Sequence, residues 1–294
     1  KGQWEVTKFY GYNTKTKTLY YQSNEQSPIQ KNIYSINVFG KKKRLLVKNF
    51  GTNTATFNKN YNYFINTHSS ANTPNIIELY NSKGEKQRTI KSSKRLTETL
   101  QKYELTKKEF FDFKTEDGIL LNGWMMKPTD FKEDVKYPVL MYVYGGPGSQ
   151  TVQDSWDRHY MWYQMLCQQG YIIVSIDNRG TGGRGAEFKK CTYKELGKLE
   201  TIDQIEGAKY LSKLPYIDDQ RIGIWGWSYG GYMSSLCILK GAEYFNTAIA
   251  VAPVTNWRFY DTIYTERYMQ TPQENPDGYD LNSPIHHVDS LNGN

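Results

Sequence analysis

The sequence predicts two kinds of fold in one chain: antiparallel β-sheets over residues 1–95 and a doubly wound, mostly parallel α/β sheet over residues 96–294. The first half alternates apolar and polar residues in short runs that Asn, Gly, Ser and Pro interrupt, which is typical of antiparallel strands. The second half alternates continuous apolar runs with helical patterns, which favours a parallel sheet covered by helices. Two domains are therefore predicted, with the boundary near residue 95.

A repeat in the first half predicts its architecture. The run YYQSNEQSPIQKNIYSINVFG from Tyr20 aligns with YFINTHSSANTPNIIELYNSK from Tyr63, so that Asn32 aligns with Asn75 at a spacing of 43 residues. A strand-rich period of about 40 to 50 residues is typical of one four-stranded blade of a β-propeller. Because two blades cannot close a propeller, we expect further blades before Lys1.

The second half begins with a short connecting helix, RLTETLQKYELTK, and a hairpin around Asp117 and Gly118. Four apolar runs then predict buried strands: YPVLMYVYGG, YIIVSID, RIGIWGW and TAIAVAP. Helices are expected between them, which makes a parallel arrangement with helical crossovers the predicted topology.

Two of these helices have specific signals. The first carries a stripe at i, i+4, i+7 and i+11, formed by Trp156, Tyr160, Tyr163 and Cys167. The second is predicted to begin with a capping box of Thr201 and Gln204. Its predicted buried face consists of Ile202, Ile205, Ala208 and Leu211.

The stretch GWSYGG, residues 226–231, places a serine between glycines at a sharp turn from a strand into a helix. This is the context of the nucleophile elbow in α/β-hydrolases, where small neighbours allow a tight turn that projects the serine hydroxyl. The pattern predicts Ser228 as a nucleophile and the backbone N–H of Tyr229 as an oxyanion donor. The alternative is a serine that only caps the helix.

A second oxyanion donor is expected in the loop after the third strand of the domain, where the sequence reads VYGGPG, residues 143–148. The phenolic hydroxyl of Tyr144 could be this donor, or its ring could simply pack beside the strand. The residues alone leave both alternatives open.

Composition argues against several other functions. Residues 1–127 hold 22 Lys and Arg against 10 Asp and Glu, but the basic run at residues 41–44 lies in a predicted turn, so no nucleic-acid site is expected. The three cysteines are too far apart in sequence to predict a disulfide framework or a zinc site. No run of apolar residues is long enough to predict a membrane span.

The stretch GTGGRG, residues 180–185, matches the dinucleotide-binding pattern G-x-G-x-x-G. That site needs an acidic residue about 20 positions later that closes a second strand, whereas Glu200 stands beside a predicted helix start. Serine acyl transfer requires no cofactor, so neither a cofactor nor a metal is expected.

On five motifs the chain resembles the dipeptidyl peptidase IV branch of the prolyl oligopeptidase family of serine peptidases. They are VYGGPGSQ, DNRGTGGRG, DQIEGAKYL, RIGIWGWSYGGY and VAPVTNWRFYDTIYTERYM, and they cover most of residues 100–270. The resemblance implies a propeller joined to an α/β-hydrolase domain, and release of X-Pro or X-Ala dipeptides from peptide N-termini. It also implies an exported, for example periplasmic, enzyme that forms homodimers.

The resemblance also implies roles for individual residues. Ser228 becomes the nucleophile, Tyr144 the side-chain oxyanion donor and Tyr229 the backbone donor. The implied pocket for the penultimate proline is lined by Val254, Trp257, Tyr260 and Tyr264. Aromatic walls suit a flat proline ring that has no N–H, but without the resemblance the spacing of these residues equally fits a helix packing stripe.

The base and the acid of a catalytic triad are not identified. In α/β-hydrolases they follow the serine in the order acid, then histidine, and only His286 and His287 come after Ser228. We therefore expect the catalytic Asp and His beyond Asn294, and the glutamates that bind the substrate amine before Lys1. The alternatives are an oligopeptidase or acylaminoacyl peptidase of the same family or, if the chain ends at Asn294, an inert peptide-binding fragment.

Overall fold

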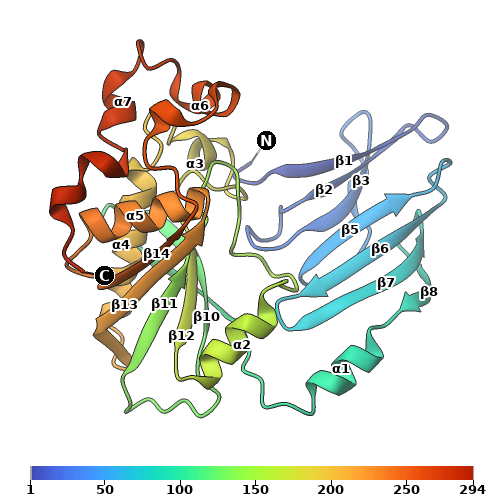
Figure 1. The fold of residues 1–294 in the computed structure, drawn as a ribbon. Coiled ribbons are helices and arrows are strands. Elements are labelled where there is room, and N and C mark those ends of the chain that lie inside the picture. Colours follow the sequence, from blue (N-terminus) through green and yellow to red (C-terminus); the bar gives the residue numbers. More distant parts are fainter. Residues whose placement is uncertain (1, 294) are drawn as a thin grey trace. The chain divides into compact units, whose positions relative to one another are not determined.

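The computed structural model describes residues 2–293, which form two compact units (Figure 1). The first unit extends to Lys107 and includes residues 153–160 and 183–186, and the second contains the remainder. The predicted boundary after residue 95 falls within the first unit, inside the helix α1, Lys94–Leu100.

The first unit is built of two antiparallel, four-stranded sheets, and in each the strand order follows the chain. One contains β1 (Val6–Asn13), β2 (Thr18–Ser23), β3 (Asn32–Asn37) and β4 (Arg44–Leu45). The other contains β5 (Thr52–Phe57), β6 (Tyr63–Ser70), β7 (Thr73–Asn81) and β8 (Lys86–Lys91). A small core of apolar residues, including Ile33 and Phe64, is buried in this unit. The two copies of the repeat therefore correspond to the two four-stranded sheets, as the sequence predicts.

The second unit contains a six-stranded sheet in the order β14-β13-β11-β12-β10-β9. These strands are β9 (Glu109–Lys114), β10 (Leu120–Met126), β11 (Tyr137–Tyr142), β12 (Ile172–Asp177), β13 (Ile217–Trp227) and β14 (Thr247–Val251). The strands β11 to β14 pair in parallel, and the hairpin β9-β10 is added in antiparallel fashion. The prediction of a mostly parallel sheet is confirmed.

Helices cover the faces of this sheet (Figure 1). The helices α4 (Lys198–Ser212) and α5 (Tyr229–Lys240) lie side by side on one face, and α2 (Tyr160–Gln168) lies on the other. The short helices α3 (Ala186–Lys190), α6 (Thr262–Met269) and α7 (Pro276–Asp280) and three 3₁₀ segments complete the chain. Within residues 2–293, no helix combines the length and the apolar character needed to cross a membrane.

The predicted starts of two helices are wrong. Helix α2 begins at Tyr160, so Trp156 precedes it, although the two rings are in contact with centroids 4.3 Å apart. Helix α4 begins at Lys198, and the carboxylate of Glu200 accepts a hydrogen bond from the Gly197 N–H at 2.9 Å.

The predicted capping pair of α4 lies inside the helix instead. Thr201 and Gln204 are buried, while Ile202 remains 44% exposed. The physical reason is that Gln204 has a buried partner, because its Nε2 donates to Oδ1 of Asn178 at 3.0 Å. The buried face of α4 is therefore partly polar, which an apolar periodicity does not detect; only Ala208 and Leu211 of the predicted face are fully buried.

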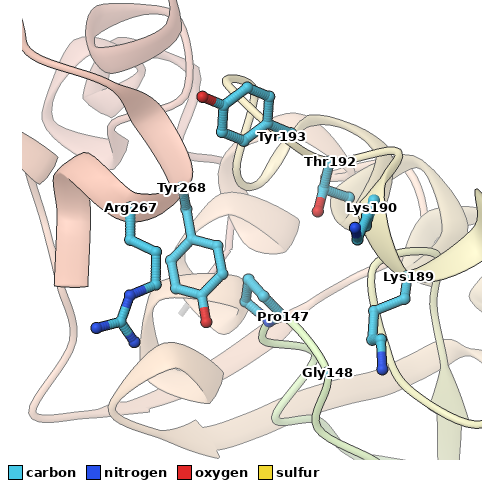
Figure 2. Close-up of a pocket in the computed structure, with 8 residues that line it drawn as sticks. All are labelled: Pro147, Gly148, Lys189, Lys190, Thr192, Tyr193, Arg267 and Tyr268. Carbon is cyan, nitrogen blue, oxygen red and sulfur yellow. The ribbon is translucent and has the colours of Figure 1, made fainter. Parts of the chain in front are cut away.

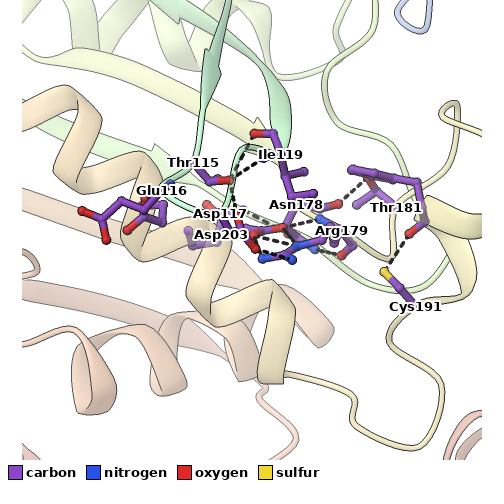
Figure 3. Close-up of polar contacts among 12 residues, drawn as sticks. Thr115, Glu116, Asp117, Ile119, Asn178, Arg179, Thr181, Cys191 and Asp203 are labelled. Atoms are coloured by element: carbon purple, nitrogen blue, oxygen red, sulfur yellow. Dashed lines mark hydrogen bonds and ion pairs between the residues drawn. The ribbon is translucent and has the colours of Figure 1, made fainter.

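Arg179, which follows β12, connects three segments of the second unit (Figure 3). Its Nη2 lies 2.6 Å from Oδ1 of Asp203 on α4, and its backbone N–H donates to Oδ2 of Asp203 at 2.7 Å. Its Nη1 donates to Asp117, in the β9-β10 turn, at 2.9 Å. Asp203 is buried, whereas the Asp117 side chain is 52% exposed.

We expect Asp203→Asn to lower the free energy of unfolding by about 3 kcal/mol, because the neutral amide leaves the largely buried guanidinium of Arg179 without its principal anion. Urea unfolding of the purified protein measures the effect. The matched control is Asp117→Asn, which removes an exposed partner of the same arginine and should cost less than about 1 kcal/mol. Equal losses for the two variants would contradict this account.

Candidate active site

The predicted nucleophile lies on a strained turn. Ser228 separates the end of β13 from the start of α5 and has φ 59° and ψ −115°, a left-handed conformation that costs a non-glycine residue roughly 1–3 kcal/mol. Its backbone N–H donates to the Val251 carbonyl at 2.9 Å. A Cβ atom would lie 2.3 Å from the Val143 oxygen at Gly226 and 2.2 Å from it at Gly230, so the turn requires both glycines.

The hydroxyl of Ser228 makes no hydrogen bond to any of the residues that the structure describes. Tyr229, the next residue, begins α5, and the first N–H groups of a helix have no acceptor within it. This end of the helix also carries the positive end of the helix dipole. The arrangement can stabilise negative charge that develops beside the serine.

The loop after β11 is held by buried side-chain amides. Asn178 donates from Nδ2 to the Gly145 carbonyl at 3.0 Å, and Gln204 donates to Asn178 in turn. Both amides are fully buried. The loop that carries Tyr144 is thus fixed from α4 and from the end of β12, by two residues that the sequence analysis did not identify as part of the site.

Tyr144 lies against the residue after the serine. Its ring centroid is 6.0 Å from that of Tyr229, and a Cβ atom on Gly146 would meet both rings at 3.0 Å. Within residues 2–293 the Tyr144 hydroxyl has no hydrogen-bond partner. Burial raises the pKa of Tyr144, so this hydroxyl is protonated near neutral pH and is able to donate.

The predicted pocket residues form one aromatic cluster. The ring centroid of Trp257 lies 5.9 Å from that of Tyr260 and 6.1 Å from that of Tyr264. The centroids of Tyr260 and Tyr264 are 5.5 Å apart. Trp257 is buried and Tyr260 is 42% exposed. Val254 packs, partly buried, against the adjacent core.

These residues do not form a helix packing stripe. Trp257 lies in a 3₁₀ segment, Trp257–Phe259, and Tyr264 lies in α6, while Tyr260 is extended between them. Asp261 caps α6 by accepting the Tyr264 N–H at 2.9 Å. The rings meet because the chain turns between two short helices, so the alternative of a single helical stripe is excluded.

Tyr229 connects the two parts of the site. In addition to Tyr144, its ring contacts Trp257 at 5.7 Å and Tyr232 at 5.2 Å between centroids. Its hydroxyl donates to Oε1 of Glu200 at 2.7 Å, and both side chains are buried. The sequence analysis considered Glu200 only as a possible ribose ligand and missed this contact. Its position three residues after the N-cap Gly197 signals its bond to the Gly197 N–H, but no sequence signal points to Tyr229.

A cavity of about 500 Å³ lies beside the loop and the aromatic cluster (Figure 2). Its lining is rich in basic and aromatic side chains and consists of Pro147, Gly148, Lys189, Lys190, Thr192, Tyr193, Arg267 and Tyr268. Tyr268 joins it to the cluster, because its ring centroid lies 5.0 Å from that of Tyr264. Neither Ser228 nor the four predicted pocket residues line this cavity.

No histidine in the described part of the chain bonds to Ser228. His286 lies 3.7 Å from the Asp280 carboxylate, and Nε2 of His287 lies 2.8 Å from the Leu281 carbonyl. The base and the acid thus stay predictions, as do the roles of the residues described above. Over residues 2–293 there is no group of three or more His, Cys, Asp or Glu side chains that could hold a metal ion.

Comparisons with known proteins cover nearly the whole chain. The model of the prolyl oligopeptidase family matches residues 158–294, and that of the dipeptidyl peptidase IV N-terminal region matches residues 1–75. The chain is 38% identical to "Probable dipeptidyl-aminopeptidase B" of Sclerotinia sclerotiorum, with 100% of the chain and 32% of that protein covered. It is 37% identical to "Dipeptidyl peptidase 4" of Trichophyton equinum, with 99% of the chain and 38% of that protein covered.

A solved structure gives the same picture. The crystal structure of Porphyromonas gingivalis dipeptidyl peptidase 4 superposes with a TM-score of 0.96 at 46% identity, and the match covers 100% of this chain and 41% of that one. The chain therefore spans about a third to two fifths of the length of these relatives.

Proposed function

The chain belongs to the dipeptidyl peptidase IV branch of the prolyl oligopeptidase family, and on that premise we propose that the protein containing it is a serine dipeptidyl peptidase. Its proposed substrates are peptides with Pro or Ala as the second residue, from which it releases the N-terminal dipeptide. The observation that carries the proposal is the contact of Tyr229, next to the strained Ser228, with both Tyr144 and Trp257.

In the proposed reaction the Ser228 oxygen attacks the carbonyl carbon of the second residue of the substrate while a general base takes the serine proton. The Tyr144 hydroxyl and the Tyr229 N–H donate to the oxyanion of the tetrahedral intermediate, which collapses to an acyl-enzyme as the amine leaves with a proton. Water then releases the dipeptide and restores the serine. In the chain order of α/β-hydrolases, the acid and then the histidine base follow the serine.

The aromatic cluster supports the proposed preference for proline. The buried ring of Trp257 supports the rings of Tyr260 and Tyr264, of which Tyr260 is the more exposed, and a proline ring brings an apolar surface without an N–H that would need a partner. Polar or charged side chains would leave groups unsatisfied against these walls.

Substrate profiling of the full-length protein tests the proposal against its alternatives. We expect Xaa-Pro anilides with a free amine to be cleaved with a kcat/KM at least on the order of 10²-fold higher than their N-acylated counterparts, because a site that pairs a charged group discriminates strongly against its absence. Comparable cleavage of N-acylated peptides would contradict the dipeptidyl peptidase proposal and favour an acylaminoacyl peptidase or oligopeptidase.

Homodimer formation and export to the periplasm or beyond remain proposals that rest on family resemblance alone. Sedimentation analysis of the full-length protein measures the first, and cell fractionation measures the second.

A further inference from the structure

Glu200 is a buried carboxylate whose partners carry no positive charge. It lies in the first turn of α4 and is 0% exposed. Its Oε2 accepts the Gly197 N–H at 2.9 Å and its Oε1 accepts the Tyr229 hydroxyl at 2.7 Å. No Lys, Arg or His among residues 2–293 forms an ion pair with it.

Asp203, one turn further along α4, provides the contrast. Its carboxylate is equally buried but is bound by the Arg179 guanidinium. A buried carboxylate that lacks such a partner loses its hydration without a compensating charge, and it is expected to destabilise the fold when ionised. Stability alone therefore gives no reason for an acid rather than a neutral amide at position 200.

The partner of Glu200 suggests what the acid does. We propose that Glu200 is a positioning residue of the proposed peptidase. Through its hydrogen bond with the Tyr229 hydroxyl it fixes the orientation of Tyr229, which bears the predicted backbone oxyanion donor and lies between Tyr144 and Trp257. The inference rests on the proposed function, because its effect is measured as turnover.

The geometry makes the orientation of Tyr229 consequential. Its ring touches Tyr144 on one side and Trp257 on the other, with centroids 6.0 Å and 5.7 Å away. Tyr229 directly follows Ser228 in the chain. A tilt of Tyr229 therefore moves three things together: its own N–H, which is the predicted donor, its contact with the predicted pocket residue Trp257, and the ring that supports Tyr144. Displacements of about 1 Å at such positions cost up to 10²-fold in rate.

The hydrogen bond between Glu200 and Tyr229 is strongest when the carboxylate is ionised. The pKa of Glu200 is raised to about 7, chiefly by burial and to a smaller extent by the neighbouring Asp203, against the opposing effect of the hydrogen bonds from Tyr229 and Gly197. The other titratable groups that face Glu200 are Tyr232, Tyr264 and the Cys191 thiol, and burial raises the pKa of each, so all are neutral near pH 7. Of the groups that face one another here, Glu200 is thus the one whose pKa lies near 7.

The test compares Glu200→Gln and Tyr229→Phe in the full-length protein, with kcat and KM for an Xaa-Pro anilide measured from pH 5.5 to 9. We expect Glu200→Gln to lower kcat at pH 8 about tenfold and to change KM less than about twofold. In the pH profile of kcat, the fall on the acidic side should lose its component near pH 7. Tyr229→Phe should lower kcat to a similar degree and lose the same component of this limb, because without the hydroxyl the charge on Glu200 no longer acts on the position of residue 229.

The double variant and a stability measurement separate positioning from a purely structural role. If Glu200 acts through Tyr229, the second substitution should change kcat less than about twofold in the background of the first. The free energy of unfolding should change in the opposite direction to kcat in Glu200→Gln. The folded pKa of about 7 exceeds the ordinary unfolded value of about 4.3, so wild-type stability falls between these pH values, and Glu200→Gln should gain relative stability there.

Each outcome is decisive. Two kinetic results would overturn the inference: losses in kcat that multiply in the double variant, or acidic limbs of the pH profile that are unchanged in both single variants. A loss of stability in Glu200→Gln that accounts for the lost activity would also overturn it. Should Glu200→Gln fail to fold, the loss or retention of this limb component in Tyr229→Phe alone decides. The control Glu195→Gln removes an exposed carboxylate that pairs with Lys198 and should leave kcat and its pH dependence unchanged. Absence of turnover in the wild type would instead reject the proposed function.

Discussion

Ser228→Ala should reduce the turnover of Xaa-Pro anilides by the full-length protein on the order of 10⁶-fold, because loss of the nucleophile removes the acyl-enzyme pathway. The strained conformation of Ser228 supports this expectation. A positive φ at a non-glycine residue persists only where the surrounding structure imposes it, and here the Val251 carbonyl and the two flanking glycines do so. The measurement is steady-state hydrolysis, with the concentration of folded variant determined by absorbance and circular dichroism.

A second substitution at this position separates chemistry from folding. Ser228→Gly should be equally inactive yet more stable than Ser228→Ala by about 1 kcal/mol in thermal unfolding, because glycine adopts a positive φ at little steric cost. Ser212→Ala, at the end of α4, removes another partly buried serine hydroxyl and should retain full activity. Residual turnover above about 1% in Ser228→Ala would exclude Ser228 as the nucleophile.

The elbow and the sheet could be predicted from the sequence because their signals are local. A tight turn needs Gly226 and Gly230 beside Ser228, and each buried parallel strand is a continuous apolar run that can be read over a few residues. The two four-stranded units likewise follow from a repeat and from alternating patterns. None of these predictions requires knowledge of a distant partner.

The buried polar residues that support the candidate site could not be predicted, because their signals are not local in the sequence. Glu200, Gln204 and Asn178 are polar residues that a sequence pattern assigns to the surface, and their burial depends on partners 26 to 33 residues away. The predicted capping box at Thr201 and Gln204 was wrong because these side chains are directed to the core. Spacing alone could not distinguish the predicted aromatic pocket from a single helical stripe, because the turn of the chain at Tyr260 leaves no mark in that spacing.

Tyr144→Phe should lower kcat by roughly 10² to 10³-fold with little change in KM, because an oxyanion donor acts on charge that exists only in the transition state. The phenylalanine ring keeps the contact with Tyr229, so the pocket and the elbow should remain in place. Burial raises the pKa of Tyr144, so its hydroxyl remains a donor throughout the range of the assay. The deficit should accordingly be constant from pH 6 to 9, unlike that of Glu200→Gln.

This pH independence makes the result specific. A rate loss caused by disturbed packing would also raise KM and lower the unfolding temperature, whereas the loss of a donor leaves both near their wild-type values. Tyr210→Phe offers a matched control, because that ring stacks on Phe113 with centroids 4.7 Å apart, away from the candidate site, and its hydroxyl should be dispensable. Near-normal turnover in Tyr144→Phe would leave Tyr229 as the only oxyanion donor among the predicted residues and would return Tyr144 to a packing role.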